Sequence, residues 1–161
     1  MEIEENTVVK INYSLHLQTG ELPERLRQSF TSKFIYGKDR ILPALEKAIA
    51  GHKEGDELEV SVPPEQTYGP HDPGLVNEIS IADIRHPEKL RVGSYYEETG
   101  PDGRTVGFSV NKIRGDSVLA DFNHPAAGKD IILKVKITEV RPASFMDLVA
   151  SMNLSVPRGK G

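Results

Sequence analysis

Residues 121–128 read Asp121-Phe122-Asn123-His124-Pro125-Ala126-Ala127-Gly128, and this stretch decides how the chain is organised. An alternating, strand-like pattern lies on either side of it. A second stretch, Gln66 to Gly74, has a similar content of Pro, Gly, His and aromatic residues. We interpret the two stretches as the ends of one excursion, in which the chain leaves a parent domain near Gly69 and returns near Asn123.

The composition is that of an ordinary globular protein, with 161 residues of which 37% are hydrophobic and 27% charged. The net charge is −4 without a basic block, which argues against nucleic acid and anionic membranes as partners. Because cysteine is absent, disulfides, thiolate metal sites and a cysteine nucleophile are excluded. No apolar run approaches the roughly 20 residues of a transmembrane helix, and the acidic N-terminus lacks a signal-peptide core. We therefore expect a soluble cytoplasmic protein.

Periodicity in the first part of the chain predicts strands around a single helix. The apolar residues at 41, 42, 45, 48 and 49 form one stripe, which predicts a helix over Ile41 to Ala50. Asp39 is its expected N-cap, and Gly51 is expected to end it. Residues 22–32 are polar and are expected to form a loop or an edge segment. Strands are predicted over residues 8–17, 33–36 and 58–62.

After Pro70 the strand pattern restarts, with predicted strands over residues 78–84, 94–99, 105–114, 117–122 and 131–140. Ser144 to Asp147 resembles a capping box and predicts a short final helix. Its apolar face is expected to hold Phe145, Leu148, Val149 and Met152.

So short a helix must dock on something, and we favour a structural cap on the parent domain. The alternative is that this helix, or Leu154 to Pro157, binds a substrate groove, since the Val-Pro bond there resembles a substrate. Residues 153–161 are expected to form a loose tail.

No conventional catalytic constellation is visible. The histidines are His16, His52, His71, His86 and His124, and no pair of them has a familiar metal-ligand spacing. No phosphate-binding loop or nucleophile elbow occurs. The sequence therefore predicts no metal site and no cofactor. Tyr68 stands out because it lies in a loop, between Thr67 and Gly69, where a core role is less natural.

Four stretches, in this order and spacing, resemble the FKBP-type peptidyl-prolyl isomerases of the SlyD/SlpA class. They are residues 8–13 with Thr19-Gly20; Tyr36-Gly37 with residues 41–48 and 51–56; Thr67-Tyr68-Gly69; and residues 121–128. The last resembles the motif Asn-His-Pro-Leu-Ala-Gly, with Ala126 in place of Leu. In that family an extra domain is inserted where ordinary members have a short flap.

The resemblance implies an α+β protein. An antiparallel half-barrel sheet wrapped on one helix is expected in residues 1–69 and 123–142, with an inserted, mostly β domain in residues 70–122. Residues 143–161 would add the short helix and tail. The implied function is peptidyl-prolyl cis/trans isomerisation with chaperone activity, acting as a monomer on unfolded or nascent chains that contain X-Pro bonds.

The resemblance also implies the site residues. Glu24 stands where the family usually has Asp, Leu133 where it has an aromatic residue, and Leu45 where many members have Trp, so the pocket is expected to be roomier. The tail lacks His and Cys, so the nickel role of some relatives is not carried over. The implied catalytic residues are Tyr68, Glu24 and Tyr13, and the implied substrate-binding residues are Phe34, Ile41, Leu42, Leu45 and Leu133.

Two other functions remain open. The loss of aromatic residues is consistent with a holdase chaperone or peptide-binding module whose isomerase activity is weak or lost. A metal-binding regulator is a more distant alternative.

Overall fold

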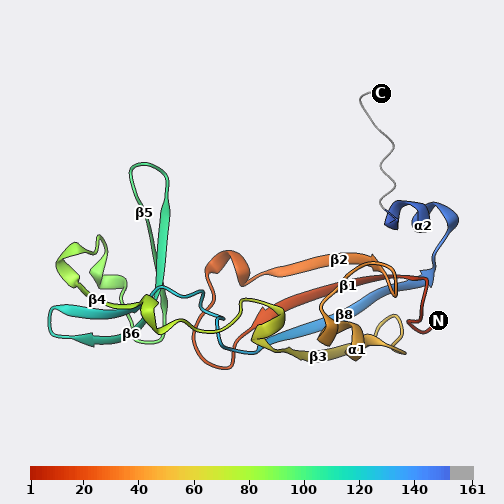
Figure 1. Cartoon of the computed structure of the whole chain (residues 1–161), viewed down its shortest axis with the longest axis horizontal. Coiled ribbons are helices and arrows are strands. Elements are labelled where there is room, and N and C mark those ends of the chain that lie inside the picture. Colours follow the sequence, from red (N-terminus) through yellow and green to blue (C-terminus); the bar gives the residue numbers. More distant parts are fainter. Residues whose placement is uncertain (153–161) are drawn as a thin grey trace. The chain divides into compact units, whose positions relative to one another are not determined.

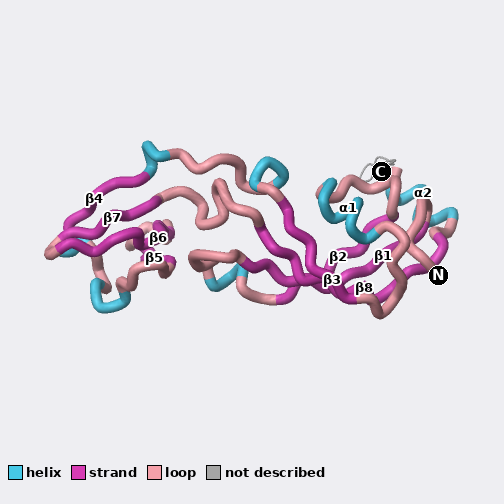
Figure 2. Tube along the Cα trace, turned by 90° about the horizontal axis from the view of Figure 1, so that it is seen from below, coloured by secondary structure: helices cyan, strands magenta, loops and turns pink. Residues whose placement is uncertain are grey.

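The computed structural model describes residues 1–152, which form two compact units (Figure 1). The first unit contains Met1–Ser14, Ser29–Val62 and the chain from Leu133 onward. The second contains Leu15–Gln28 and Pro63–Ile132. Sheets dominate both units, in agreement with the expected α+β class (Figure 2).

The first unit is built on a four-stranded sheet in the order β2-β1-β8-β3. Strands β1 and β2 are antiparallel, and Val9 lies opposite Phe34. Side chains alternate between the two faces of a strand, so every second residue of β8 is buried from Ile131 to Ile137. The strands are β1 (Thr7–His16), β2 (Ser29–Ile35), β3 (Glu57–Val62) and β8 (Ile131–Pro142).

Strand β2 begins earlier than the strand predicted from residue 33, because Ser29 to Ser32 also belong to it. Since β2 is an edge of its sheet, these residues form the edge segment of the two expected alternatives, and not the loop. The physical reason is an aromatic pair across the two strands, which the polar residues around Phe30 made hard to predict from the sequence. Phe30 lies opposite Tyr13, and the two rings stack with their centroids 5.6 Å apart. Such aromatic pairs stabilise an antiparallel ladder.

The helix α1 (Pro43–Ile49) is shorter than predicted and begins differently. Leu42 is its N-cap, with the extended backbone that a following proline favours. Asp39 is therefore not the N-cap; its carboxylate accepts a hydrogen bond from the Ile35 backbone N–H at 2.7 Å. Gly51 ends the helical region as predicted, with a φ of +79°. The helix lies beside β3 and buries Leu45 and Ile49.

The second unit contains a four-stranded antiparallel sheet in the order β4-β7-β6-β5. The predicted strand over 78–84 is wrong at its end, because Ser80 accepts a hydrogen bond from the Ala82 N–H and starts a 3₁₀ turn. The strands are β4 (Val76–Ser80), β5 (Tyr95–Thr99), β6 (Thr105–Arg114) and β7 (Ser117–Asp121). The core of this unit consists of Ile84, Tyr96, Phe108, Val110, Val118 and Ala120.

The two stretches singled out in the sequence lie side by side in the second unit. The Gly128 N–H donates to the Gly69 carbonyl at 2.8 Å. The Asn123 side chain accepts from the Asp72 N–H and donates to the Asp72 carbonyl, both at 2.9 Å. We call these contacts the clasp. Gly128 adopts a φ of +73°, and a side chain there would also collide with His71.

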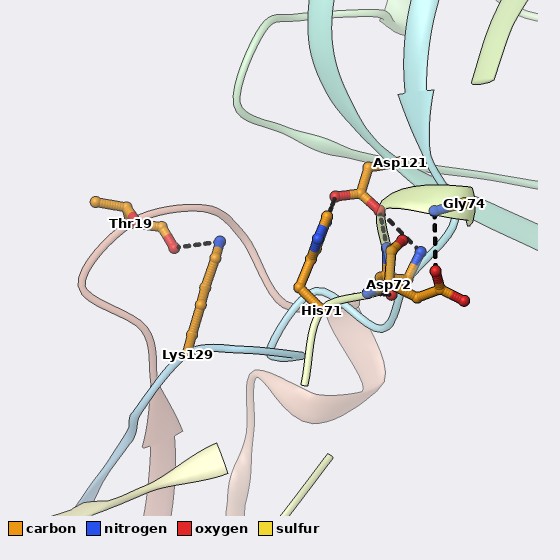
Figure 3. A network of polar contacts seen from close by, with 7 residues as sticks. Thr19, His71, Asp72, Gly74, Asp121 and Lys129 are labelled. Carbon is orange, nitrogen blue, oxygen red and sulfur yellow. Dashed lines mark hydrogen bonds and ion pairs between the residues drawn. The ribbon is translucent and has the colours of Figure 1, made fainter. Parts of the chain in front are cut away.

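Asp121 is the charged centre of the clasp (Figure 3). One of its oxygens accepts from both the backbone and the side chain of Asn123, and the other lies 2.7 Å from His71 Nε2. Burial raises the pKa of Asp121, but the hydrogen bonds from Asn123 and His71 lower it below its ordinary value. The clasp therefore holds an ionised carboxylate.

The final helix α2 (Phe145–Ser151) begins with the predicted capping box, in which Ser144 and Asp147 bond each other reciprocally. Its predicted apolar face is found in part. Leu148 and Val149 are partly buried, and α2 lies against β2, but Phe145 is 77% exposed and Met152 61% exposed. Polar contacts also hold the helix: Arg141 pairs with Asp147 at 2.8 Å, and Ser151 donates to Asp39 at 2.7 Å.

The tail at 153–161, including Leu154 to Pro157, lies outside the described residues. Among residues 1–152, no helix is both long enough and apolar enough to cross a membrane.

The clasp predicts that Asn123→Ala destabilises the second unit. The substitution leaves the Asp72 N–H and carbonyl without their partner, which we expect to lower the free energy of unfolding by roughly 1–3 kcal/mol. Urea denaturation measures the change. Asn77→Ala, on an exposed position of β4, is the matched control and should be nearly neutral. Equal effects of the two substitutions would contradict the role given to the clasp.

The docking of α2 should depend on acid. The hydrogen bonds from Arg141 and Ser144 lower the pKa of Asp147 well below its ordinary value. The contribution of Asp147 to docking is thus fully present above the unfolded-state pKa of about 3.9 and is lost as the pH falls through the lowered value. NMR shifts of the Leu148 amide should report this transition. An identical acid transition in Asp147→Asn would show that another group is responsible.

Candidate active site

The residues that the sequence proposed for the site fall into two sets, one in each unit. The first unit holds Tyr13, Phe34, Ile41, Leu42, Leu45 and Leu133. The second unit holds Glu24 and Tyr68.

Three members of the first set are buried. Phe34 comes from β2, Leu45 from α1 and Leu133 from β8, and each is at most 7% exposed. Ile41 and Leu42, just before α1, remain partly exposed. The first unit therefore supplies an apolar interior together with two more accessible apolar side chains.

The start of α1 also offers a backbone donor. The Leu42 carbonyl accepts the first helical hydrogen bond, from the Glu46 N–H at 2.9 Å. Within residues 1–152, the Leu42 N–H makes no hydrogen bond. The first N–H groups of a helix commonly lack partners, and they are free to bind a carbonyl oxygen.

Tyr13 lies in a different setting from the buried set. It is half-buried and lines a groove with residues of β1, β2, β3 and β8, among them Glu57, Leu58 and Lys134. Neither Phe34 nor Leu133 lines this groove. Sequence reasoning missed Phe30, the aromatic partner of Tyr13. Strand register, which pairs the two residues, was the missing signal.

Tyr68 is 44% exposed, and its loop is closely held. The N–H groups of Thr67 and Gly69 both donate to the Pro64 carbonyl, at 3.0 and 2.8 Å. The ring lies against the His124 ring, with centroids 3.5 Å apart and an interplanar angle of 8°. The sequence had marked Tyr68 as a site candidate and His124 as a member of the other stretch, but it did not predict their contact.

His124 is neutral in this arrangement. The Ala126 backbone N–H donates to its Nδ1 at 3.0 Å, so the ring proton lies on Nε2. Burial lowers the pKa of His124, and the positive charge of Arg25 lowers it further.

Glu24 is exposed and begins a 3₁₀ turn, Glu24–Leu26. It lines a cavity of about 970 Å³ within the second unit, which Tyr68 does not line. The walls carry both charges, and Arg25 pairs with Glu97 at 2.8 Å. In the part of the chain that the structure describes, no three histidine or acidic side chains gather as metal ligands.

Comparisons with known proteins identify the family of the chain. Residues 1–111 match the model of the FKBP-type peptidyl-prolyl cis-trans isomerase family. The chain is 30% identical over 162 residues to the SlyD isomerase of Treponema pallidum, covering 100% of this chain and 91% of the relative. It is 29% identical over 151 residues to SlyD of Haemophilus influenzae, covering 92% of this chain and 77% of the relative.

A third relative is the FKBP-type 16 kDa peptidyl-prolyl cis-trans isomerase of Escherichia coli. It is 28% identical over 142 residues, covering 88% of this chain and 95% of the relative. By the matched family model and by relatives that align over most of its length, the chain belongs to the FKBP-type peptidyl-prolyl cis-trans isomerases and is an enzyme of that class.

Proposed function

We propose that the protein speeds cis/trans isomerisation of X-Pro bonds in unfolded or nascent chains and acts as a chaperone toward them. The observation that carries this proposal is Tyr68, a partly exposed phenol on a closely held loop in one of the family's motifs. Because the residue is 44% exposed, we take its hydroxyl as the group that a polypeptide can reach.

The chemistry requires shape and polarity rather than a nucleophile. An X-Pro bond isomerises over a barrier of about 20 kcal/mol, which reflects lost amide resonance. The twisted transition state is less dipolar than either planar form. Apolar surroundings therefore favour the transition state over the ground states relative to water, which is catalysis by differential binding.

The residues take the following proposed roles. The Tyr68 hydroxyl donates to the carbonyl before proline, and the Leu42 N–H binds a second substrate carbonyl. Glu24 keeps the acidic group of the family on a side chain one methylene longer. Tyr13, Phe34, Ile41, Leu42, Leu45 and Leu133 supply apolar contacts to the prolyl segment, with leucines at two positions that are aromatic in many relatives.

The inserted segment, proposed as residues 70–122, captures unfolded chains. Strands β4 and β5 are the edges of its sheet, and edge strands can pair with extended peptides. Exposed apolar side chains on β6 are a second attraction, since Val106 is 52% and Ile113 41% exposed.

A holdase without isomerase activity is the alternative. A protease-coupled assay on a short X-Pro peptide separates the two functions. Rates near the uncatalysed value, with aggregation suppression intact, would favour the holdase.

The role of Tyr68 predicts that Tyr68→Phe lowers kcat/KM toward a short X-Pro peptide by up to about tenfold, the worth of one net hydrogen bond. Folding should be little changed, because the substitution keeps the ring that stacks on His124. Tyr36→Phe is the contrasting control: it removes a hydroxyl that donates to the Glu46 carbonyl and should lower stability instead. An unaltered rate in Tyr68→Phe would leave that residue with a packing role alone.

The capture role predicts that catalysis of peptides and of whole proteins can be separated. Val76 and Asp121 are opposite each other, so a short turn can replace residues 77–120, which keeps Asp121 and leaves the Asp72–Asn123 and Gly69–Gly128 bonds in place. We expect peptide isomerisation to persist while catalysis of proline-limited refolding falls sharply. Refolding catalysis that survives this replacement would move substrate capture to another surface.

A further inference from the structure

We propose that His124 is a positioning residue for Tyr68: its ring holds the phenol face to face in the orientation that meets the substrate carbonyl. The inference rests on the proposed function of Tyr68 and assigns a role to a residue outside the candidate site.

The geometry leaves Tyr68 little other support. Its ring is 44% exposed, and an exposed loop tyrosine ordinarily samples several rotamers. The parallel stack on His124, with centroids 3.5 Å apart, covers one face of the phenol, and the residue as a whole stays 44% exposed. An orientation held before binding costs the substrate less ordering entropy than one imposed by it.

The residues before and after His124 in the chain restrict its position. Pro125 follows and restricts the backbone. The Ala126 N–H donates to Nδ1 at 3.0 Å, and the Ala127 N–H donates to the His124 carbonyl at 2.9 Å. The preceding residue, Asn123, belongs to the clasp. These contacts hold the imidazole ring in one orientation, and the clasp sets the position of that ring relative to Tyr68.

The arrangement requires a neutral imidazole. Protonation would put an Nδ1–H against the Ala126 N–H, so two donors would face each other and the ring would have to turn away from Tyr68. Burial lowers the pKa of His124 below its ordinary value, and Arg25 is the charged group acting in the same direction; Tyr68 is the titratable neighbour on the ring face. As the pH falls from about 6.5 through this lowered value, the acceptor and the stack are lost together.

The experiment compares His124→Phe, which keeps a flat aromatic face, with His124→Ala, which removes it. We expect His124→Ala to lower kcat/KM for a short X-Pro peptide by about three- to tenfold and His124→Phe to stay near wild type. In a double-mutant cycle, His124→Ala should cost nothing further in a Tyr68→Phe background. His52→Ala, in a turn of the first unit, is the control for losing a histidine and should leave activity unchanged.

The pH profile distinguishes a positioning role of His124 from a merely structural one, because only the positioning role predicts a change in the profile. Wild type should lose activity as the pH falls from about 6.5 through the lowered pKa of His124, and His124→Phe should lack this acidic limb. If His124→Ala does not fold, these two profiles decide the question alone: identical profiles would overturn the proposal. Equal losses in His124→Phe and His124→Ala would also overturn it, because the stack would then not be the cause.

A different set of results would overturn the proposed function of Tyr68. If Tyr68→Phe is as active as wild type, the hydroxyl has no role and neither does its positioning. If Tyr68→Phe is impaired while His124→Ala is not, only the inference about His124 is overturned.

Discussion

The organisation of the second unit depends on the clasp between Asn123 and the backbone of Asp72. The side-chain amide of Asn123 bonds both backbone polar groups of one residue, Asp72, as a neighbouring strand does in a β-ladder, and so joins segments 51 residues apart in the chain. A bidentate contact of this kind fixes distance and rotation together. Once this contact has closed the long loop between the two segments, later contacts between them form without a second loss of loop-closure entropy of that size. The Gly69–Gly128 bond and the β4–β7 pairing continue from this point in opposite directions.

Function follows from the same constraint. Prolyl isomerisation calls for no proton transfer from a side chain, so catalysis depends on how well apolar surfaces and one or two donors are held in place. The clasp places Tyr68 and His124 next to each other, although they come from the two separate stretches. The ionised Asp121 stabilises it, because Asn123 and His71 both donate to the carboxylate.

Polar contacts also hold α2, where packing of apolar residues would have been expected. The α2 helix shows helical spacing of apolar residues, yet Phe145 and Met152 face solvent. Arg141 and Ser151 hold the helix through Asp147 and Asp39. Leu42 and not Asp39 is the N-cap of α1, and the two carboxylate oxygens of Asp39 accept from Ser151 and from the Ile35 N–H.

The sequence by itself determined the antiparallel strands, the helix before Gly51 and the capping box at Ser144, because these depend on alternation, helical spacing and local turn residues. It also identified the two stretches of the clasp and the apolar site candidates. Only the tertiary structure decided that Phe30 pairs with Tyr13 and that His124 stacks on Tyr68. The reason is physical: strand register and the closure of a long loop set which residues meet, and neither is encoded in the local pattern around either partner.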